Sequence, residues 1–403
     1  MKPLHLFATA IIVAGTAFAW FILGGTISKR SGSFGRSTAQ DVTHVWGPTL
    51  VQQHPDAFFL TPNAPGGRAV MQPTESRVHI DLESDPKKRG LLWHRTYQMK
   101  FAADYVFTNP TRIPQTVYFR FPLPAETHGL HGFTLKLGEE TGNGTVPAAR
   151  DGVITRALLV PAGASVPLSV SYVTRGTDHW NYHFPDARRI AGFQLAMRTN
   201  FTDIDFPVGT GSPTDRVMDS SGWSLTWNYP DVISARDIGM DMPKLLNAGP
   251  VAARIAFFAP VSLLFFVTVV LLIGGLRGVP LHPMHVFFVS AGFFAFHLLF
   301  AYLVDHLPLF PSFAIAAIAS MVLVSGYLRA VGGAILFKVA LPAQFAYMVL
   351  FSASFFFDGL TGITIAIGAV ITLAILMILT AKVDWKTVFT PSKPSPPEVP
   401  QHA

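Results

Sequence analysis

Long apolar runs dominate the chain after residue 250, and they constrain its fold more than any other feature. The runs cover residues 255–276, 284–304, 309–328, 337–356 and 360–381. An α-helix rises 1.5 Å per residue, so each run approaches the ~20 residues that cross ~30 Å of hydrocarbon. The pattern therefore predicts a membrane α-helical bundle, with a five-helix C-terminal transmembrane bundle over residues 251–386.

The few basic residues of this region predict its orientation. Nearly all of them fall in alternate connections between the apolar runs, namely at Arg277, Arg329, Lys338, Lys382 and Lys386. The turns around Asp305-His306 and Asp358 carry no Lys or Arg. Because basic loops stay in the cytoplasm, we expect a cytoplasmic C-terminus, followed at residues 387–403 by a proline-rich disordered tail.

Composition supports an integral membrane protein and narrows its chemistry. Half of the residues are hydrophobic (50%), 13% are charged, and there is no cysteine. Cysteine zinc sites, thiolate nucleophiles and disulfides are therefore excluded. The formal net charge of +6 is scattered over loops without a basic run, so we predict the lipid bilayer as a partner and no nucleic acid.

An apolar run at residues 6–25 leaves two alternatives for the N-terminus. Ala17-Phe18-Ala19 has the form of a cleavage site for a secretion signal, but apolar residues continue beyond it. We favour a retained transmembrane anchor over residues 1–28, with a cytoplasmic N-terminus. Either alternative places residues 29–250 outside the cytoplasm as a large periplasmic domain.

The exported segment shows the periodicity of β-strands. Buried-type residues alternate with polar ones over 97–107, 117–121, 133–137, 166–172, 193–197 and 223–229. Such alternation is typical of half-buried strands, and Gly, Pro and Asn turns separate them. We therefore predict an all-β, β-sandwich-like periplasmic domain, entered through an irregular segment at residues 31–73.

No residue pattern here indicates catalysis, a cofactor or a metal. His179 and His183 have helical zinc spacing, but their neighbours alternate as in a strand, where the two rings would lie ~13 Å apart. The Gly-x-Ser-x-Gly elbow and the glycine-rich phosphate loops do not occur. We predict no catalytic, cofactor-binding or metal-binding residues and no enzymatic activity.

Ionisable groups inside membranes are costly and usually functional, and His297 is the one deep within an apolar run. Its two interpretations are a neutral histidine that packs between helices and a proton-sensitive site. Lys338 lies near a helix end, where its side chain can reach the interface. Ser320, Ser325 and Gln344 are expected to hydrogen bond between helices.

Residues at the helix ends resemble a known family. Leu281-His282-Pro283-Met284 opens one run, Asp305-His306 closes it, Gly326-Tyr327-Leu328-Arg329 ends the next, and Val383-Asp384-Trp385 follows the last. In this order the segments are similar to the C-terminal half of the CreD family of bacterial inner-membrane proteins. The signature residues, which we treat as candidate interaction residues, are His282, Pro283, Asp305, His306, Gly326, Tyr327, Arg329, Asp384 and Trp385.

The resemblance implies a non-catalytic, multi-pass protein of the inner (plasma) membrane that supports cell envelope integrity and the stress response. Its signature residues have two interpretations, as architecture of the bundle or as an interaction site at the cytoplasmic face. Asp305 stands where relatives usually carry Glu. A homo-oligomer or an envelope protein partner is expected, and the alternative functions are a periplasmic ligand sensor or signalling accessory and a transporter component.

Overall fold

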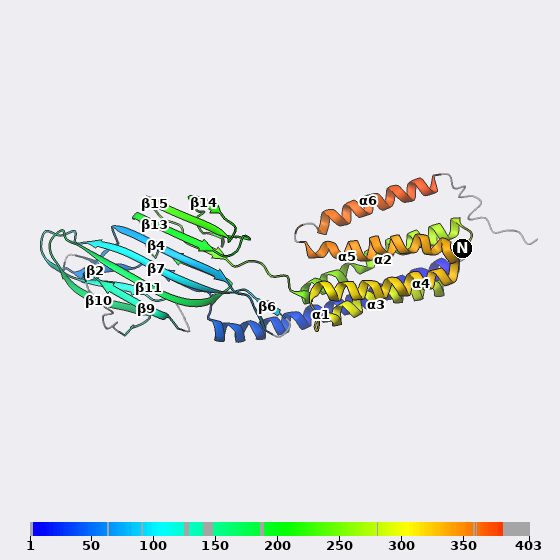
Figure 1. The fold of residues 1–403 in the computed structure, drawn as a ribbon, viewed down its shortest axis with the longest axis horizontal. Helices are drawn as coiled ribbons and strands as arrows, with labels where there is room; N and C mark the ends of the chain where they lie inside the picture. The colour runs from blue at the N-terminus through cyan, green and yellow to red at the C-terminus, as the bar shows by residue number, and fades with distance from the viewer. Residues whose placement is uncertain are drawn as a thin grey trace, which may run out of the picture. The chain divides into compact units, whose positions relative to one another are not determined.

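The computed structural model describes residues 3–62, 64–89, 92–124, 129–139, 148–185, 189–279, 281–357, 359 and 361–381. The chain divides into two compact units, which we call the β unit (residues 34–245) and the helical unit (residues 1–33 and 246–403). Figure 1 shows strands in the first and long helices in the second. The predicted combination of a β-rich domain with apolar helices is therefore confirmed.

The described residues of the β unit form four sheets. The largest has the strand order β14-β15-β13-β4-β7-β11-β9, and the others are β10-β8-β2-β3, β1-β12-β16 and β5-β6. The strands are β1 (Leu50–Gln53), β2 (Asp56–Leu60), β3 (Arg68–Met71), β4 (Glu75–Ser84), β5 (Lys87–Arg89), β6 (Leu92–His94), β7 (Thr96–Thr108), β8 (Gln115–Pro122), β9 (His131–Leu137), β10 (Val153–Val160), β11 (Ser165–Thr177), β12 (His179–His183), β13 (Arg189–Thr199), β14 (Asp215–Met218), β15 (Trp223–Ile233) and β16 (Ile238–Asp241). The buried residues of β1, β2, β4, β7, β8, β9, β10, β11, β12, β13, β15 and β16 share one hydrophobic core, whereas β14 is exposed along its length.

The alternation in the sequence becomes the two faces of these strands. In β7, Tyr97, Phe101 and Tyr105 are buried, whereas the intervening Lys100 and Asp104 are exposed. All six predicted strands are present, as β7, β8, β9, β11, β13 and β15. Two longer strands were missed: β4, although Val78, Ile80 and Leu82 alternate with polar residues, and β10, whose exposed Leu158 and Leu159 obscure its period.

The predicted irregular entry at residues 31–73 is wrong in its first part. Helix α1 (Pro3–Trp46) continues beyond the apolar run. Its last turns pack within the β unit, where Val42 is 4% exposed and Trp46 lies under the side chains of Lys87 and Arg175, at 4.8 and 4.9 Å from the ring centroid. Tertiary packing therefore extends a helix whose local sequence of Gly, Ser and Thr does not favour one.

The helical unit contains the other long helices. They are α2 (Ala248–Leu276), α3 (Pro283–Leu303), α4 (Leu309–Gln344) and α6 (Thr361–Thr380), and α4 continues through a π-helix (Phe345–Leu350), α5 (Phe351–Ala353) and a 3₁₀ turn (Ser354–Phe356). Among the described residues, 5 helices are long and apolar enough to cross a membrane, with Leu309–Phe356 counted as one. The predicted turn at Asp358 and tail at residues 387–403 lie outside the described residues.

The long segment Leu309–Phe356 folds back on itself at two glycines. Gly332 and Gly333 have non-helical backbone angles, and Gly333 has φ 62° and ψ −153°. The Ser320 hydroxyl lies 3.2 Å from the Met348 sulfur, although a straight helix would separate the two residues by about 40 Å. The segment is therefore an antiparallel helical hairpin, which agrees with separate runs at 309–328 and 337–356.

A small polar cluster fastens this hairpin. The Gln344 amide donates to the Ser320 hydroxyl at 3.2 Å, the Ser325 hydroxyl donates to the Gln344 carbonyl oxygen at 3.2 Å, and Ser320 also donates to the Gly292 carbonyl of α3 at 2.7 Å. The expected role of these three residues as hydrogen-bonding links between helices is confirmed.

Candidate functional site

Asp305, at the end of α3, is bound by a basic residue of α1. The Arg30 guanidinium contacts both carboxylate oxygens of Asp305, at 3.0 and 3.2 Å, and donates to the Ala301 carbonyl at 3.4 Å. The two side chains are 31% and 17% exposed, so water screens their attraction only in part. This charge-assisted pair fixes α1 against the end of α3.

At the opposite end of α3, a second set of polar side chains gathers. His282 caps the helix, because its Nδ1 accepts from the Met284 N–H at 3.2 Å and Pro283 occupies the first turn. The rings of His5 and His282 lie 5.2 Å apart, and His285 is 2.8 Å from the Tyr327 hydroxyl of α4. Three helices therefore meet at this histidine cluster. Because His5 and Arg30 of α1 contact the beginning and the end of α3, in that order, α1 runs parallel to α3.

His297 lies between these two ends. Its Nδ1 donates to the Phe293 carbonyl of its own helix at 3.1 Å, and its ring packs edge-on against Trp20 of α1 with centroids 5.2 Å apart. Within the described part of the chain, no hydrogen-bond partner is found for His297 Nε2 or Trp20 Nε1. The site is a sealed apolar contact without a neighbouring carboxylate, which favours the packing interpretation.

The remaining signature residues do not converge on one site. Arg329 stacks over the Phe337 ring across the hairpin at 5.4 Å, and Gly326 borders a groove there. The His306 backbone N–H donates to the Leu303 carbonyl at 3.0 Å, near Asp305. Asp384 and Trp385 lie outside the described residues. Asp305 and Tyr327 thus belong to opposite ends of the helical unit.

The β unit buries a polar chain in its core. His54 Nδ1 lies 2.8 Å from the Tyr182 hydroxyl, which lies 2.9 Å from the Tyr105 hydroxyl. Burial lowers the pKa of His54 to about 3 and raises the pKa of Tyr182 well above its usual range. Both groups are therefore neutral at physiological pH, and the chain acts as an internal tie between strands.

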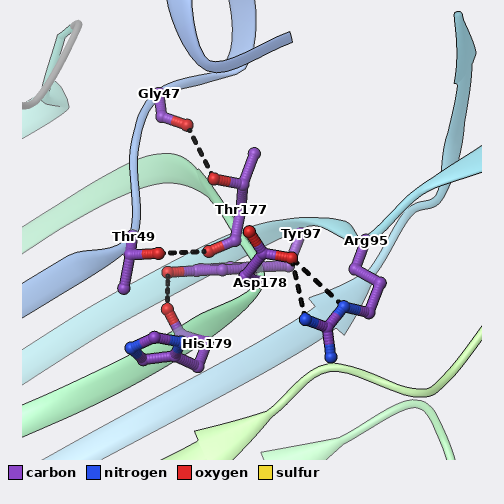
Figure 2. Close-up of polar contacts among 7 residues, drawn as sticks. All are labelled: Gly47, Thr49, Arg95, Tyr97, Thr177, Asp178 and His179. Atoms are coloured by element: carbon purple, nitrogen blue, oxygen red, sulfur yellow. Dashed lines mark hydrogen bonds and ion pairs between the residues drawn. The ribbon is translucent and has the colours of Figure 1, made fainter. Parts of the chain in front are cut away.

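A second cluster ties the end of α1 to the sheets (Figure 2). The Thr177 hydroxyl donates to the Gly47 carbonyl at 3.2 Å, and the Arg95 guanidinium contacts Asp178 at 2.9 Å. Gly47 has φ +99°, and a Cβ there would lie 2.7 Å from the Arg175 carbonyl oxygen. Only glycine satisfies both constraints, which gives Gly47 an architectural role.

The two histidines with zinc-like spacing have other partners. The Tyr97 hydroxyl donates to the His179 carbonyl at 3.0 Å, and the His183 imidazole pairs with Asp237 at 2.8 Å. Across the described ranges, no group of three or more His, Cys, Asp or Glu side chains could hold a metal ion. The geometry therefore points to strand and loop contacts at these positions.

Several residues of these contacts were not identified from the sequence. They are His5, Trp20, Arg30, His54 and His285. Arg30 carried a signal, because it is unfavourable for the anchor's orientation and Asp305 is a rare acid among the apolar runs. The other four have no distinctive spacing, since their partners are distant in the sequence.

A β-rich domain joined to a bundle of long apolar helices defines the class: an integral, multi-helix membrane protein. Residues 209–386 match the family model described as "Inner membrane protein CreD", which confirms the resemblance seen in the sequence. The match covers the helical signature residues together with the last strands of the β unit. This part of the chain is thus similar to inner-membrane proteins of the CreD type.

The other comparisons add no functional information. Among curated proteins, none matches this chain. Among solved structures, a candidate nutrient-binding protein of Legionella pneumophila is similar over 55% of this chain and 77% of its own, with 11% identity and a TM-score of 0.34. A similarity of this level supports no argument about fold or function.

Proposed function

We propose that the chain is a non-catalytic inner-membrane protein that supports cell envelope integrity and the stress response. The observation that carries the proposal is the CreD family match over residues 209–386. The geometry agrees with a structural role, because Asp305, His282 and Tyr327 each join or cap helices. No reaction step is assigned to them.

For the topology we infer six membrane crossings, with the β unit in the periplasm and both termini in the cytoplasm. Two findings support it: the segment Leu309–Phe356 is a hairpin, and α1 runs parallel to α3, so the N-terminus and the Arg277–His282 connection share one side. Basic residues favour the cytoplasm for that side. The proposal also retains α1 as an uncleaved anchor, since Trp20 is buried in the bundle.

Reporter fusions test the topology directly. A reporter that is active only in the periplasm should be active after Asp358 and silent after Lys386. A fusion after Arg329 is a second silent control, since it places the reporter at the hairpin turn. The opposite result at Asp358 and Lys386 would reverse the proposed orientation.

We further propose that the β unit binds an envelope protein, or a second copy of this chain. The outer face of the sheet β10-β8-β2-β3 supports this idea, because Leu60, Val70 and Leu159 are 59%, 60% and 65% exposed there. On the opposite sheet, the outer face of β4 carries His79 and Asp81 instead. Exposed apolar side chains on one face are typical of interaction surfaces.

Photo-crosslinking from the β unit in intact cells tests the partner. A crosslinking residue at Leu60 or Val70 should capture a discrete protein, identified by mass spectrometry, whereas His79 serves as the control position. Recovery of lipid alone from Leu60 and Val70 would rule out a protein partner at this face.

Gene deletion tests the function. Cells without the protein should become sensitive to detergents and cell-wall antibiotics, and the wild-type chain should restore resistance. A chain in which Asp305→Arg and Arg30→Asp exchange the ion pair should restore more resistance than either single variant. If the deletion strain grows like its parent under every envelope stress tested, the proposed role is wrong.

A further inference from the structure

We propose that the helical hairpin of α4 binds an anionic phospholipid, with one acyl chain in a groove between its arms and the lipid phosphate on Arg329. An open groove of about 420 Å³ lies between the arms of the hairpin. It falls within the size range of small-molecule sites in proteins. The proposal rests on the chain being a membrane protein and does not depend on the proposed envelope function.

The walls of the groove suit an acyl chain. Ile318, Met321, Val322 and Leu341 line it, and Ile318 and Val322 are 62% and 68% exposed, so the groove opens outward from the bundle. Gly326 leaves the middle of the groove empty, because a Cβ at this position would meet no atom within 4 Å. Ser325 also lines the groove, and its hydroxyl donates to the Gln344 carbonyl oxygen at 3.2 Å.

Arg329 places a cation at one end of this apolar groove. It precedes the chain reversal at Gly332 by three residues, so the guanidinium lies near the end of the hairpin, at the level of the lipid headgroups. The Phe337 ring lies under the guanidinium at 5.4 Å and leaves its N–H groups free to bind an acceptor. A guanidinium binds phosphate oxygens in a bidentate manner.

Among the described residues, the charge balance favours an anion from outside the chain. Between Val251 and Ala381 the acidic residues are Asp305 and Asp358, and the next one, Asp384, lies outside the described residues. Asp305 is bound to Arg30, and it lies before α4, whose stretch from Leu309 to Arg329 spans about 30 Å. Among the residues that the structure describes, no carboxylate pairs with Arg329. Basic pockets between transmembrane helices characteristically bind anionic lipid headgroups.

Native mass spectrometry of the full chain, released from detergent containing equal phosphatidylglycerol and phosphatidylcholine, tests the site. We expect the wild-type chain to retain one phosphatidylglycerol about fivefold more often, the factor expected for one basic residue at an anionic membrane surface. Arg329→Gln should abolish the preference and Arg329→Lys should keep most of it. Gly326→Leu should remove the bound lipid by filling the groove while Arg329 is intact.

Lys338→Gln is the matched control, because this cation belongs to the same hairpin but does not line the groove. Helical circular dichroism and size-exclusion chromatography establish that each variant is folded. The proposal is overturned if the wild-type chain shows no preference, or if Lys338→Gln lowers it as much as Arg329→Gln. Displacement of the lipid by inorganic phosphate would instead assign the site to a soluble anion.

Discussion

The β unit and the helical unit bury the same kinds of side chain in different solvents. Phe193 in β13 and Phe293 in α3 are both 0% exposed, and the described residues of each unit include one buried histidine, His54 or His297. His54 is linked to tyrosines of other strands, whereas His297 is tied to its own helix. In water, the removal of apolar side chains from solvent stabilises the core of the β unit. In lipid this driving force is missing between helices, so van der Waals packing and a few interhelical hydrogen bonds stabilise the helical unit.

The largest expected effect tests this difference with the two phenylalanines. Phe193→Ala should lower the free energy of unfolding of the β unit by about 3–5 kcal/mol, from lost transfer energy and the cavity left behind. Phe293→Ala should cost about half as much, because lipid replaces water as the reference and only packing is lost. Urea titration measures the first and SDS titration the second. Equal losses of unfolding free energy in the two variants would contradict the proposed difference between the two units.

The ion pair between Arg30 and Asp305 is the next test, since it joins two opposite charges that are partly buried in the helical unit. Arg30→Gln or Asp305→Asn should destabilise the helical unit by about 2–3 kcal/mol, because each leaves a partly buried charge without its partner. A double-mutant cycle in SDS titrations isolates the coupling. If the double variant loses the sum of the two single losses, the pair contributes nothing.

The histidine of the β unit predicts a pH dependence. The folded pKa of about 3 lies below the ordinary value of 6.5, so the stabilising effect is complete above pH 6.5 and is lost as the pH falls toward 3. The free energy of unfolding should decrease by about 2 kcal/mol from pH 6.5 to pH 5 through this group. Urea titrations at both pH values measure it. His54→Gln should show a shallower slope; an unchanged slope would assign the effect to other groups.

The smallest effect is expected at the histidine of the helical unit. His297→Phe keeps a ring of similar size against Trp20 and removes an unpaired nitrogen, so stability should change by less than about 1 kcal/mol. Envelope sensitivity should also be unchanged. A strong loss of resistance in a folded His297→Phe chain would revive the proton-sensitive interpretation.

Periodic features were predictable because each depends on neighbouring residues. The alternation of Tyr97, Phe101 and Tyr105 predicts β7, and the apolar runs predict the long helices. The end of α1 was not predictable, since Trp46 gains its stability from Lys87 and Arg175, which are distant in the sequence. The candidate sites follow the same division: His282 and Asp305 were recognised by family resemblance, whereas their partners His5 and Arg30 were not.

The sequence alone determined that this chain has apolar helices, a β-rich domain, and basic residues in alternate connections. These properties follow from side-chain periodicity, length and charge, which are local. Only the tertiary structure decided which residues meet: Arg30 with Asp305, His285 with Tyr327, and Ser320 with Gln344. Such pairs depend on how helices pack and where the chain reverses at Gly332–Gly333, and no local pattern encodes them.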